Sequence, residues 1–535
     1  MDRFKEYTVG SVLGHFSTKS PDKVVFVCGE DEISYGQLQD RSLRLAEGLR
    51  GMGIKNDDKV SIWAPNSIDW IIIQLAAAYI GAVLVPINTR HRLTELEYTL
   101  KQSDSTTFFF AEEFGPVNFL DIFTELCPEV GTSQPGMLSS KKFPLLKNVI
   151  SLGGWSHPGM FRFEDLERER ESKTTQTMSG PDDVSIIQYT SGTTGPPKGV
   201  MLTQGQTVRD AHCVAKRMEL TDDDVILCSV PFAHSGGTIL STLLTLVVGA
   251  SMIIQPYFDV EEAMGLIEKY RCTVFNGLET FFISIYSHPR FNDFNLSSLR
   301  TGWAPGPPEV LHAIIDKMGM KKICNLFGMS ETSPNTSISL PTDPPEVRAT
   351  TCGKPHEGLE VKIIDPDTGE PLPPGQVGEI YVRGWNVMKG YYNKPEETAE
   401  AIDAEGWLHT GDLGTFNTEG YLMFKGRLKE LIRVGGENVS PWEVENFILS
   451  HPAVKQVIAL GIPDERLGEV CAAVVQLREG ASCAPEDIME FCRGKMASFK
   501  IPKRVKIVDE FPMTESGKVQ KYKLPELFLG QEKEK

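Results

Sequence analysis

The chain has 535 residues, more than one ordinary domain needs and enough for about two to four domains. Apolar residues make up 41% and charged residues 24%, a balance typical of folded globular proteins rather than disordered ones. Acidic residues outnumber basic ones by 72 to 54, and the formal charge is −18. This charge argues against nucleic acid or an anionic membrane surface as the main partner, although a local basic site can still hold a phosphate.

The first 115 residues alternate between strand-like and helix-like segments. Residues 33–54 predict a strand that leads into an amphipathic helix, and residues 59–65 (KVSIWAP) predict a further strand. Residues 67–82 predict a helix and residues 83–87 (VLVPI) a strand. This repetition predicts a layered α/β fold with a parallel sheet and right-handed crossovers.

Two apolar runs, residues 70–87 and 238–254, approach the length of a membrane span. A Gly-Ala pair divides each run, and strand-like residues follow the pair. We therefore expect a helix, a tight turn and a buried parallel strand in each run, and no transmembrane span. The scattered cysteines and a start without a secretory signal favour a reducing compartment, and hence the cytoplasm.

The composition and the predicted secondary structure change at three places along the chain. Proline, glycine and serine become frequent over residues 112–180, which we interpret as a surface connection, and the α/β pattern resumes at about residue 184. Turn residues near 360 predict a β-rich section of hairpins. We expect a compact α+β unit after Gly426, and hence a large N-terminal α/β domain of several subdomains, 1–428, and a small domain, 429–535.

The strongest local motif is YTSGTTGPPKGV, residues 189–200, which follows a predicted strand. Its hydroxyls and glycines offer many donors and a backbone able to wrap a phosphate, and a lysine adds a cation. It does not match the Walker pattern, which argues against a P-loop kinase or GTPase. The expected phosphate-binding residues are Thr190, Ser191, Gly192, Thr193, Thr194, Gly195 and Lys198.

This motif resembles the phosphate-binding signature of the adenylate-forming superfamily, which includes acyl-CoA synthetases, peptide-synthetase adenylation domains and beetle luciferases. Five further segments match that superfamily in the right order, and the likeness runs from about residue 30 to 525. They are VPFAHSGG (230–237), NLFGMSET (325–332), HTGD (409–412), GRLKELIRVGGENVSPWEVE (426–445) and PMTESGKVQK (512–521).

The resemblance implies an AMP-forming acid–CoA ligase that uses ATP, Mg²⁺ and coenzyme A. Lys518, Glu331 and Thr190 match the family's catalytic positions, and Glu331 is also the expected Mg²⁺ ligand. Asp412 matches the residue that holds the ribose hydroxyls, and Arg427 would contact ribose or phosphate. In the segment 325–332, Phe327 stands where the family places an aromatic against adenine, next to the nucleotide-site positions Gly328 and Ser330. Each also has a purely structural alternative, such as an exposed lysine, a turn aspartate or a core phenylalanine.

The resemblance further implies a mobile small domain that uses two faces in turn. Lys429 matches the hinge, and Gly435 and Gly436 would line the channel for the coenzyme A thiol. An ordinary exposed side chain is the alternative for Lys429. The expected acyl-pocket residues are His234, Gly236, Trp303, Ala304, Gly328 and Met329.

Three departures from the family bear on the acid. Trp303 stands where relatives usually have a small residue, so it would narrow the tunnel, cap the adenine side or point into the core. Gly328 replaces the tryptophan of acetate-specific relatives, which disfavours acetate. The run 233–235 has no carboxylate to pair with an α-ammonium, which disfavours amino acids.

Two further features leave alternatives open. Asn438 replaces an arginine of acetyl-type synthetases, so that phosphate contact is not carried over. The basic run 493–506 would approach the phosphates of ATP or coenzyme A, or would be a solvated helix and strand edge.

We expect the substrate to be a small-molecule carboxylate: a medium-chain fatty, alicyclic or aryl acid. The alternatives are transfer of the acyl group to a carrier-protein thiol and, outside the enzymes, an inactive nucleotide-binding scaffold. No nucleic-acid partner is expected, and a homodimer is left open.

Overall fold

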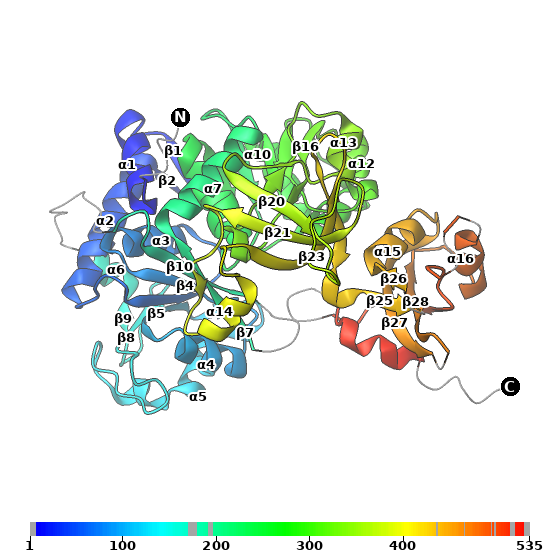
Figure 1. Ribbon diagram of the computed structural model, residues 1–535. Helices are drawn as coiled ribbons and strands as arrows, with labels where there is room; N and C mark the ends of the chain where they lie inside the picture. Colours follow the sequence, from blue (N-terminus) through cyan, green and yellow to red (C-terminus); the bar gives the residue numbers. More distant parts are fainter. Residues whose placement is uncertain are drawn as a thin grey trace. The chain divides into compact units, whose positions relative to one another are not determined.

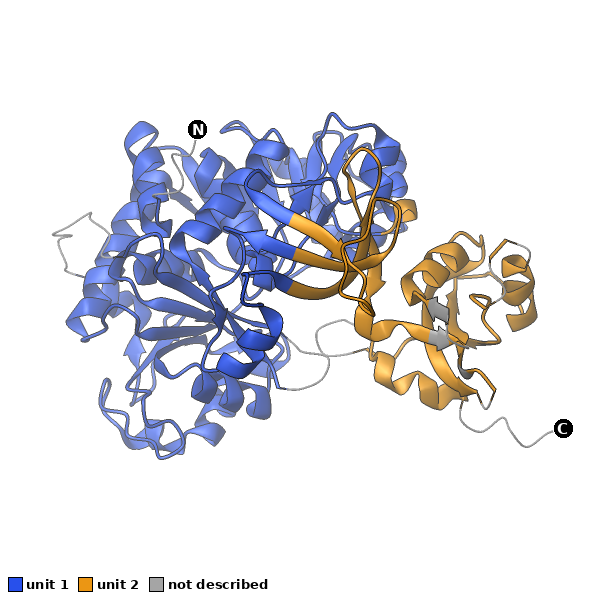
Figure 2. Cartoon of the chain, in the orientation of Figure 1, with its two compact units in different colours: residues 1–306, 310–360, 382–408 blue, residues 307–309, 361–381, 409–535 orange. Residues whose placement is uncertain are grey.

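The structure is a computed structural model that describes residues 7–168, 179–190, 196–434, 437–464, 466–493, 495–496, 499–513 and 519–528. The chain groups into two compact units (Figure 2). Unit 1 comprises residues 1–306, 310–360 and 382–408, and unit 2 comprises residues 307–309, 361–381 and 409–535. The division falls inside strands β20, β21 and β23 and at the start of helix α12.

Unit 1 contains two large, mostly parallel sheets (Figure 1). Only β2 runs antiparallel in the seven-stranded sheet, and β11 runs antiparallel to both of its neighbours in the eight-stranded sheet. The seven-stranded sheet has the order β16 (Lys322–Cys324), β15 (Thr301–Trp303), β14 (Val274–Asn276), β12 (Val225–Cys228), β13 (Ser251–Ile254), β1 (Val24–Cys28) and β2 (Asp31–Ser34). The eight-stranded sheet has the order β22 (Gly390–Tyr391), β11 (Lys198–Thr203), β10 (Val184–Thr190), β4 (Val83–Pro86), β3 (Lys59–Trp63), β5 (Ser105–Ala111), β8 (Asn148–Leu152) and β9 (Phe161–Arg162).

Helices cover both faces of each large sheet. One apolar core joins the two sheets to the helices between them, and two further cores lie on the outer faces. The inner helices are α1 (Val9–Lys19), α2 (Tyr35–Gly51), α3 (Ile68–Ile80), α7 (Gln204–Arg217) and α9 (Leu244–Val248). The outer helices are α10 (Val260–Tyr270), α11 (Glu279–Tyr286) and α12 (Pro308–Lys317) on the seven-stranded sheet, and α4 (Leu93–Gln102) and α5 (Phe119–Leu126) on the eight-stranded sheet.

The remaining elements are short or belong to smaller sheets. A three-stranded sheet contains β17 (Leu326–Phe327), β18 (Ser337–Ile338) and β19 (Lys354–Pro355), and a four-stranded sheet contains β20 (Leu359–Ile364), β21 (Gly378–Gly384), β23 (Leu408–Phe416) and β24 (Leu422–Arg427). The short elements are β6 (Glu113–Phe114), β7 (Val117–Asn118), α6 (Phe163–Glu167), α8 (Ser235–Gly237), α13 (Pro345–Thr350), α14 (Pro395–Ala401), the π-helical segment η3 (Thr238–Leu243) and the 3₁₀ turns η2 (Pro128–Thr132), η4 (Phe291–Asp293) and η5 (Ser330–Thr332).

The C-terminal part of unit 2 forms a small α+β layer of its own. Its sheet contains β26 (Glu437–Val439), β25 (Ile432–Val434), β28 (Gly468–Leu477), β27 (Val454–Asp464) and β29 (Arg504–Val508), and β29 pairs with β28 in parallel. The helical elements are α15 (Pro441–Leu449), α16 (Pro485–Cys492), η6 (Leu428–Glu430), η7 (Lys521–Lys523) and η8 (Pro525–Phe528).

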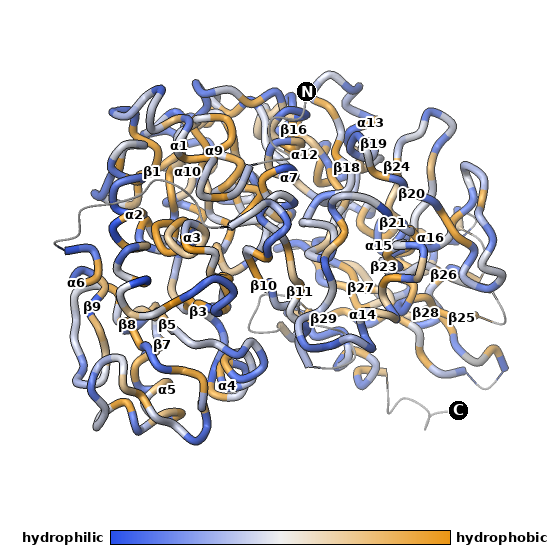
Figure 3. Tube along the Cα trace, turned by 60° about the vertical axis from the view of Figure 1, so that its left-hand side comes forward, coloured by the Kyte–Doolittle hydropathy of each residue, from blue (hydrophilic) through white to orange (hydrophobic). Residues whose placement is uncertain are grey.

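Both apolar runs fold as predicted. Helix α3 is buried nearly throughout and ends at Gly81, whose φ of 75° is the left-handed conformation that glycine adopts without strain. Figure 3 shows α3 in the hydrophobic colour. The second run forms η3 and α9, turns at Gly249 (φ 77°) and continues as β13. Within the described ranges, no helix combines the length and the apolar character that crossing a bilayer requires.

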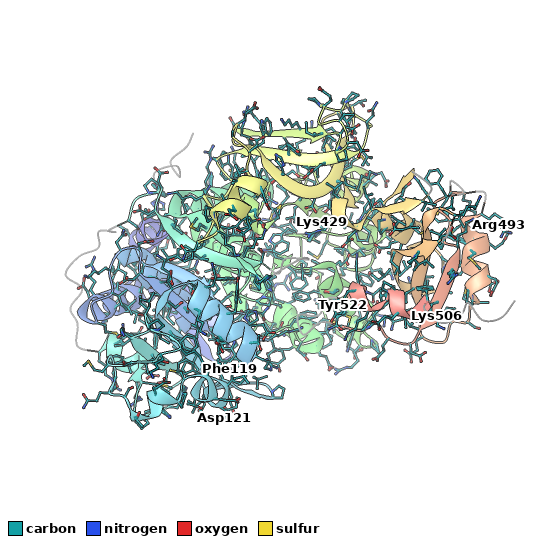
Figure 4. The ribbon with its side chains drawn as sticks, turned by 60° about the horizontal axis from the view of Figure 1, so that its bottom comes forward. Phe119, Asp121, Lys429, Arg493, Lys506 and Tyr522 are labelled. Atoms are coloured by element: carbon teal, nitrogen blue, oxygen red, sulfur yellow. The ribbon has the colours of Figure 1, made fainter. Side chains whose placement is uncertain are left out.

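The prediction of a surface connection over residues 112–180 was wrong in part. Strand β8 is buried at all five positions and pairs in parallel with β5. Helix α5 (Figure 4) packs Phe119 against Trp63 with a ring-centroid distance of 3.9 Å. A strand of five residues among prolines, glycines and serines gives no clear pattern in the sequence. Its burial is established only by its pairing within the sheet.

An ion pair between a buried carboxylate and a half-buried arginine connects three strands of the seven-stranded sheet at their amino ends. Asp224, with 4% of its side chain exposed, accepts hydrogen bonds from Arg300 at 2.5 and 2.9 Å. It also accepts from the Thr273 hydroxyl at 2.6 Å. Burial raises the pKa of Asp224, but the hydrogen bonds from Arg300 and Thr273 outweigh it, and the net pKa is lowered.

Replacing Asp224 with alanine is expected to lower the free energy of unfolding by about 1–3 kcal/mol at pH 7, because the half-buried Arg300 guanidinium loses its charged acceptor and the Thr273 hydroxyl loses its acceptor as well. Asp222→Ala is the matched control, because its ion pair with Lys19 is about half exposed and contributes about 1 kcal/mol or less. Because the pKa of Asp224 is lower in the folded state, its ionised carboxylate stabilises the fold at pH values above the unfolded pKa of about 4. This stabilisation is lost as the pH falls through the folded-state pKa. Urea unfolding should therefore show the Asp224→Ala deficit shrinking in acid, and equal losses for the two variants would contradict this account.

Candidate active site

The predicted phosphate loop connects two antiparallel strands of the eight-stranded sheet. Thr190 ends β10 and Lys198 begins β11, and the two residues pair across the hairpin. The Thr190 hydroxyl lies 3.5 Å from the Lys198 carbonyl oxygen, and the Tyr98 hydroxyl of α4 donates to the Pro197 carbonyl at 2.8 Å. The predicted residues Ser191, Gly192, Thr193, Thr194 and Gly195 lie outside the described residues.

The segment 325–332 forms β17 and the turn η5. Phe327 is buried in β17, and Gly328 and Met329 lead into η5, which carries Ser330 and Glu331. A Cβ atom built on Gly328 would lie 2.0 Å from the Pro334 carbonyl oxygen. Glycine is therefore required here by close backbone approach, independently of any room that it leaves for a substrate.

Glu331 has only 6% of its surface exposed. The Tyr391 hydroxyl donates to its Oε1 at 3.0 Å, and the Met388 amide donates to its carbonyl oxygen at 2.9 Å. The Tyr391 ring also lies beneath Lys198, with Nζ 4.7 Å from the ring centroid. The structure thus joins the loop lysine and the acidic residue of a distant motif through one tyrosine, whose role we did not predict from the sequence.

A buried polar layer supports the loop that follows Glu331. The Asn386 amide donates to the carbonyl oxygens of Thr332 and Asn335 at 3.2 and 3.0 Å, and His356 Nε2 lies 2.6 Å from Asn335 Oδ1. Burial, followed by Arg217 and Arg209, lowers the pKa of His356 to about 3. The imidazole is therefore neutral, and its Nε2 carries the proton that the amide oxygen accepts.

The predicted acyl-pocket residues come from three segments of unit 1: the start of α8, the end of β15 and the residues 328–329 described above. Trp303 ends β15 with 3% exposure, and a Cβ built on Gly236 of α8 would lie 3.4 Å from its indole ring. The Trp303 indole nitrogen donates to the Leu240 carbonyl at 3.1 Å, within η3. Ala304 is buried, whereas His234 is exposed. A π-helix often marks a functional site, and here its Leu240 carbonyl holds the tryptophan ring against the glycine.

Asp412 and Arg427 face each other on β23 and β24 in unit 2. Asp412 is 4% exposed, and its Oδ1 lies 3.2 Å from Arg427 Nε. Lys429 is exposed on η6 (Figure 4). Gly435, Gly436 and Lys518 lie outside the described residues.

The basic run 493–506 is partly neutralised within unit 2. Arg493 pairs with Glu490 at 2.6 Å, and Lys500 pairs with Glu443 at 2.7 Å. Figure 4 shows Arg493 at the end of α16 and Lys506 on β29, in separate places. The described part of the run therefore does not form one compact basic patch.

The sequence comparisons agree with this arrangement of motifs. A family model described as "AMP-binding enzyme" matches residues 14–392, and one described as "AMP-binding enzyme C-terminal domain" matches residues 443–518. The chain belongs to the AMP-binding enzyme family. It is an AMP-forming acyl-CoA synthetase, because relatives that carry such names align over nearly the whole chain.

Two of these relatives and one solved structure illustrate the likeness. "Putative acyl-CoA synthetase YngI" of Bacillus subtilis is 40% identical, covering 97% of this chain and 96% of its own length. "Medium-chain acyl-CoA ligase ACSF2, mitochondrial" of Mus musculus is 34% identical, covering 97% and 87%. The ATP-bound crystal structure of MatB from Rhodopseudomonas palustris has a TM-score of 0.84 at 27% identity, covering 98% and 99%.

Proposed function

We propose that this AMP-binding enzyme activates a medium-chain fatty, alicyclic or aryl carboxylic acid with ATP and passes the acyl group to coenzyme A. The observation that carries the proposal is the meeting of Lys198 and Glu331, from motifs far apart in the sequence, on one buried tyrosine. A cation beside a carboxylate suits a phosphate that arrives with a metal ion.

The proposed reaction has two chemical steps, formation of the acyl-AMP and formation of the thioester. A carboxylate oxygen bonds to the α-phosphorus of ATP, and the bond from that phosphorus to the bridging oxygen breaks, so pyrophosphate leaves with the electron pair. The thiol of coenzyme A then loses its proton to water, and its sulfur bonds to the acyl carbon. The bond from that carbon to the AMP oxygen breaks, and AMP leaves with the electron pair.

The donor set fits Mg²⁺, which would supply charge neutralisation on the phosphates when bound. Glu331 offers a buried carboxylate, the ligand type that Mg²⁺ prefers. The described ranges contain no group of three or more His, Cys, Asp or Glu side chains that could cage a metal. One carboxylate with substrate phosphates and water is the usual arrangement for Mg²⁺ in nucleotide sites.

The other nucleotide contacts are proposed from position and chemistry. Thr190 and Lys198 would hold the departing pyrophosphate, and Phe327 would lie against adenine. Asp412 would accept both ribose hydroxyls, since an ionised carboxylate has lone pairs beyond the one that faces Arg427. Lys518 would bridge the acid and the α-phosphate.

The position of the Trp303 indole beside Gly236, as a wall of the expected acyl pocket, supports the proposed class of carboxylic acid. A buried indole held against Gly236 favours flat or moderately long apolar acids over very long chains. The name of the mouse relative, a medium-chain acyl-CoA ligase, points the same way. An acceptor other than coenzyme A, a carrier-protein thiol, is the alternative that the first experiment separates.

The first experiment measures pyrophosphate release with Mg-ATP and a panel of acids from acetate to palmitate, with benzoate and cyclohexanecarboxylate, each with and without coenzyme A. We expect multiple turnovers only with coenzyme A, for a C4–C12 or ring acid. A single burst that ignores coenzyme A would instead favour a carrier-protein acceptor. No release with any of these acids would contradict the proposed substrate class.

Replacing Trp303 with glycine is expected to shift the chain-length preference toward longer acids, because the wall beside Gly236 is removed. The measurement is kcat/KM for pyrophosphate release across the acid panel. Trp303→Phe is the graded comparison: it keeps one aromatic ring but loses the N–H that bonds to Leu240 and the outer indole ring beside Gly236, so we expect a smaller shift than in Trp303→Gly. An unchanged chain-length profile in Trp303→Gly would reject the role of Trp303.

We also propose that the chain divides functionally between residues 428 and 429, with Lys429 at the pivot. Lys429→Pro is expected to spare acyl-AMP formation and to lower thioester formation by at least about tenfold, because proline fixes φ at the hinge. Lys429→Ala is the control, because it removes the side chain and keeps backbone freedom. Single-turnover assays of the two steps provide the measurement, and equal losses in both steps would contradict a hinge.

A further inference from the structure

We propose that Tyr391 is a positioning residue that sets the separation between the loop lysine, Lys198, and the carboxylate of Glu331, and thereby couples phosphate binding to metal binding. The inference rests on the proposed function for the roles of those two residues. Its own content is the link between them, which the phenol of Tyr391 provides.

The contacts of the phenol divide between its two functional parts. The ring face lies beneath the Lys198 ammonium group, at 4.7 Å from centroid to Nζ, within the range of a cation–π interaction. The hydroxyl donates to Glu331 Oε1 at 3.0 Å. One rigid side chain therefore holds a cation on its face and an anion at its tip.

The backbone of Tyr391 is fixed by the strand that carries Lys198. Strand β22 pairs with β11, with Tyr391 opposite Val200, and the Tyr392 amide donates to the Gly199 carbonyl at 2.8 Å. The Tyr391 amide donates to the Thr398 hydroxyl at 2.9 Å. The ring consequently has a fixed position relative to the start of β11.

The segment 386–388, just before Tyr391, is hydrogen-bonded to the turn that carries Glu331. The Ser333 hydroxyl donates to the Asn386 carbonyl at 2.7 Å, and the Met388 amide donates to the Glu331 carbonyl at 2.9 Å. Residues 386–391 therefore connect the turn η5 to strand β11 through the backbone, and the phenol repeats that connection through side chains.

The hydroxyl of Tyr391 is a donor throughout the physiological range. A phenol ordinarily keeps its proton up to a pH of about 10, and the Tyr391 hydroxyl is placed as the donor to Glu331 Oε1. A neutral phenol leaves the face of the ring attractive to Lys198 and directs one hydrogen bond at the carboxylate. This hydrogen bond orients the Glu331 side chain.

The test compares Tyr391→Phe with Tyr391→Leu and with Tyr392→Phe. Phenylalanine keeps the ring beneath Lys198 and removes the hydroxyl, whereas leucine removes both. Tyr392 is the matched control, because it is the adjacent tyrosine and its hydroxyl donates to Asp104 at 3.0 Å. The readout is the Kd of ATP, measured by calorimetry on the full chain with Mg²⁺ and again with EDTA.

Tyr391→Phe is expected to weaken ATP binding about tenfold with Mg²⁺ and less than about twofold in EDTA, because a hydrogen bond to a charged group is lost. Tyr391→Leu should weaken binding in both conditions, and Tyr392→Phe in neither. In a Glu331→Gln background, Tyr391→Phe should lose its Mg²⁺-dependent effect, since coupled residues are not additive.

Three results would overturn the inference: Tyr391→Phe behaving as Tyr392→Phe, equal weakening by Tyr391→Phe in Mg²⁺ and EDTA, or a full effect in the Glu331→Gln background. The last two results would assign a merely structural role. Failure of the proposed function has a different signature, since wild-type protein would then release no pyrophosphate with any acid while the binding comparison still applies.

Discussion

The inner helix layer of unit 1 constrains the rest of the fold, because its helices bury apolar surface against two sheets at once. Helix α3 is buried around nearly its whole circumference, which is why it resembles a membrane span in sequence, whereas α2 and α7 keep a polar face. The parallel strands on either side then end along shared edges, where loops carry polar side chains. Trp303 is the last residue of such a strand, and Gly236 and the motif after Thr190 follow the ends of β12 and β10.

The elements that the sequence predicted correctly carry a strong local signal. The helix within residues 33–54 and both apolar runs combine a hydrophobic pattern with a glycine where the chain turns. The strand expected before the phosphate motif was also predicted correctly, and it is β10. Strand β8 was missed, because five residues among turn-forming neighbours show no periodicity and become a strand only through pairing with β5.

The site was predictable as far as its motifs are continuous in sequence. Thr190, Lys198 and Glu331 stand in such motifs, whereas Tyr391 acts through partners about 60 and 190 residues away, and only the folded chain unites them. For Gly328, the sequence and the structure give different reasons for the glycine. The sequence favoured an open pocket as the reason for glycine, and the structure adds the approach of the Pro334 carbonyl as a separate physical requirement.

The hydrogen bond from the Trp303 indole to Leu240 has a consequence for redesign of the acyl wall. In the π-helical segment η3, the Leu240 carbonyl oxygen accepts a hydrogen bond from the Trp303 side chain. The Asn276 side-chain amide lies 3.4 Å from the same oxygen. A smaller residue at 303 leaves that carbonyl with its weaker donor. Donor-bearing replacements such as Gln or His, combined with changes in η3, are therefore better starting points for altered acid preference than truncation alone.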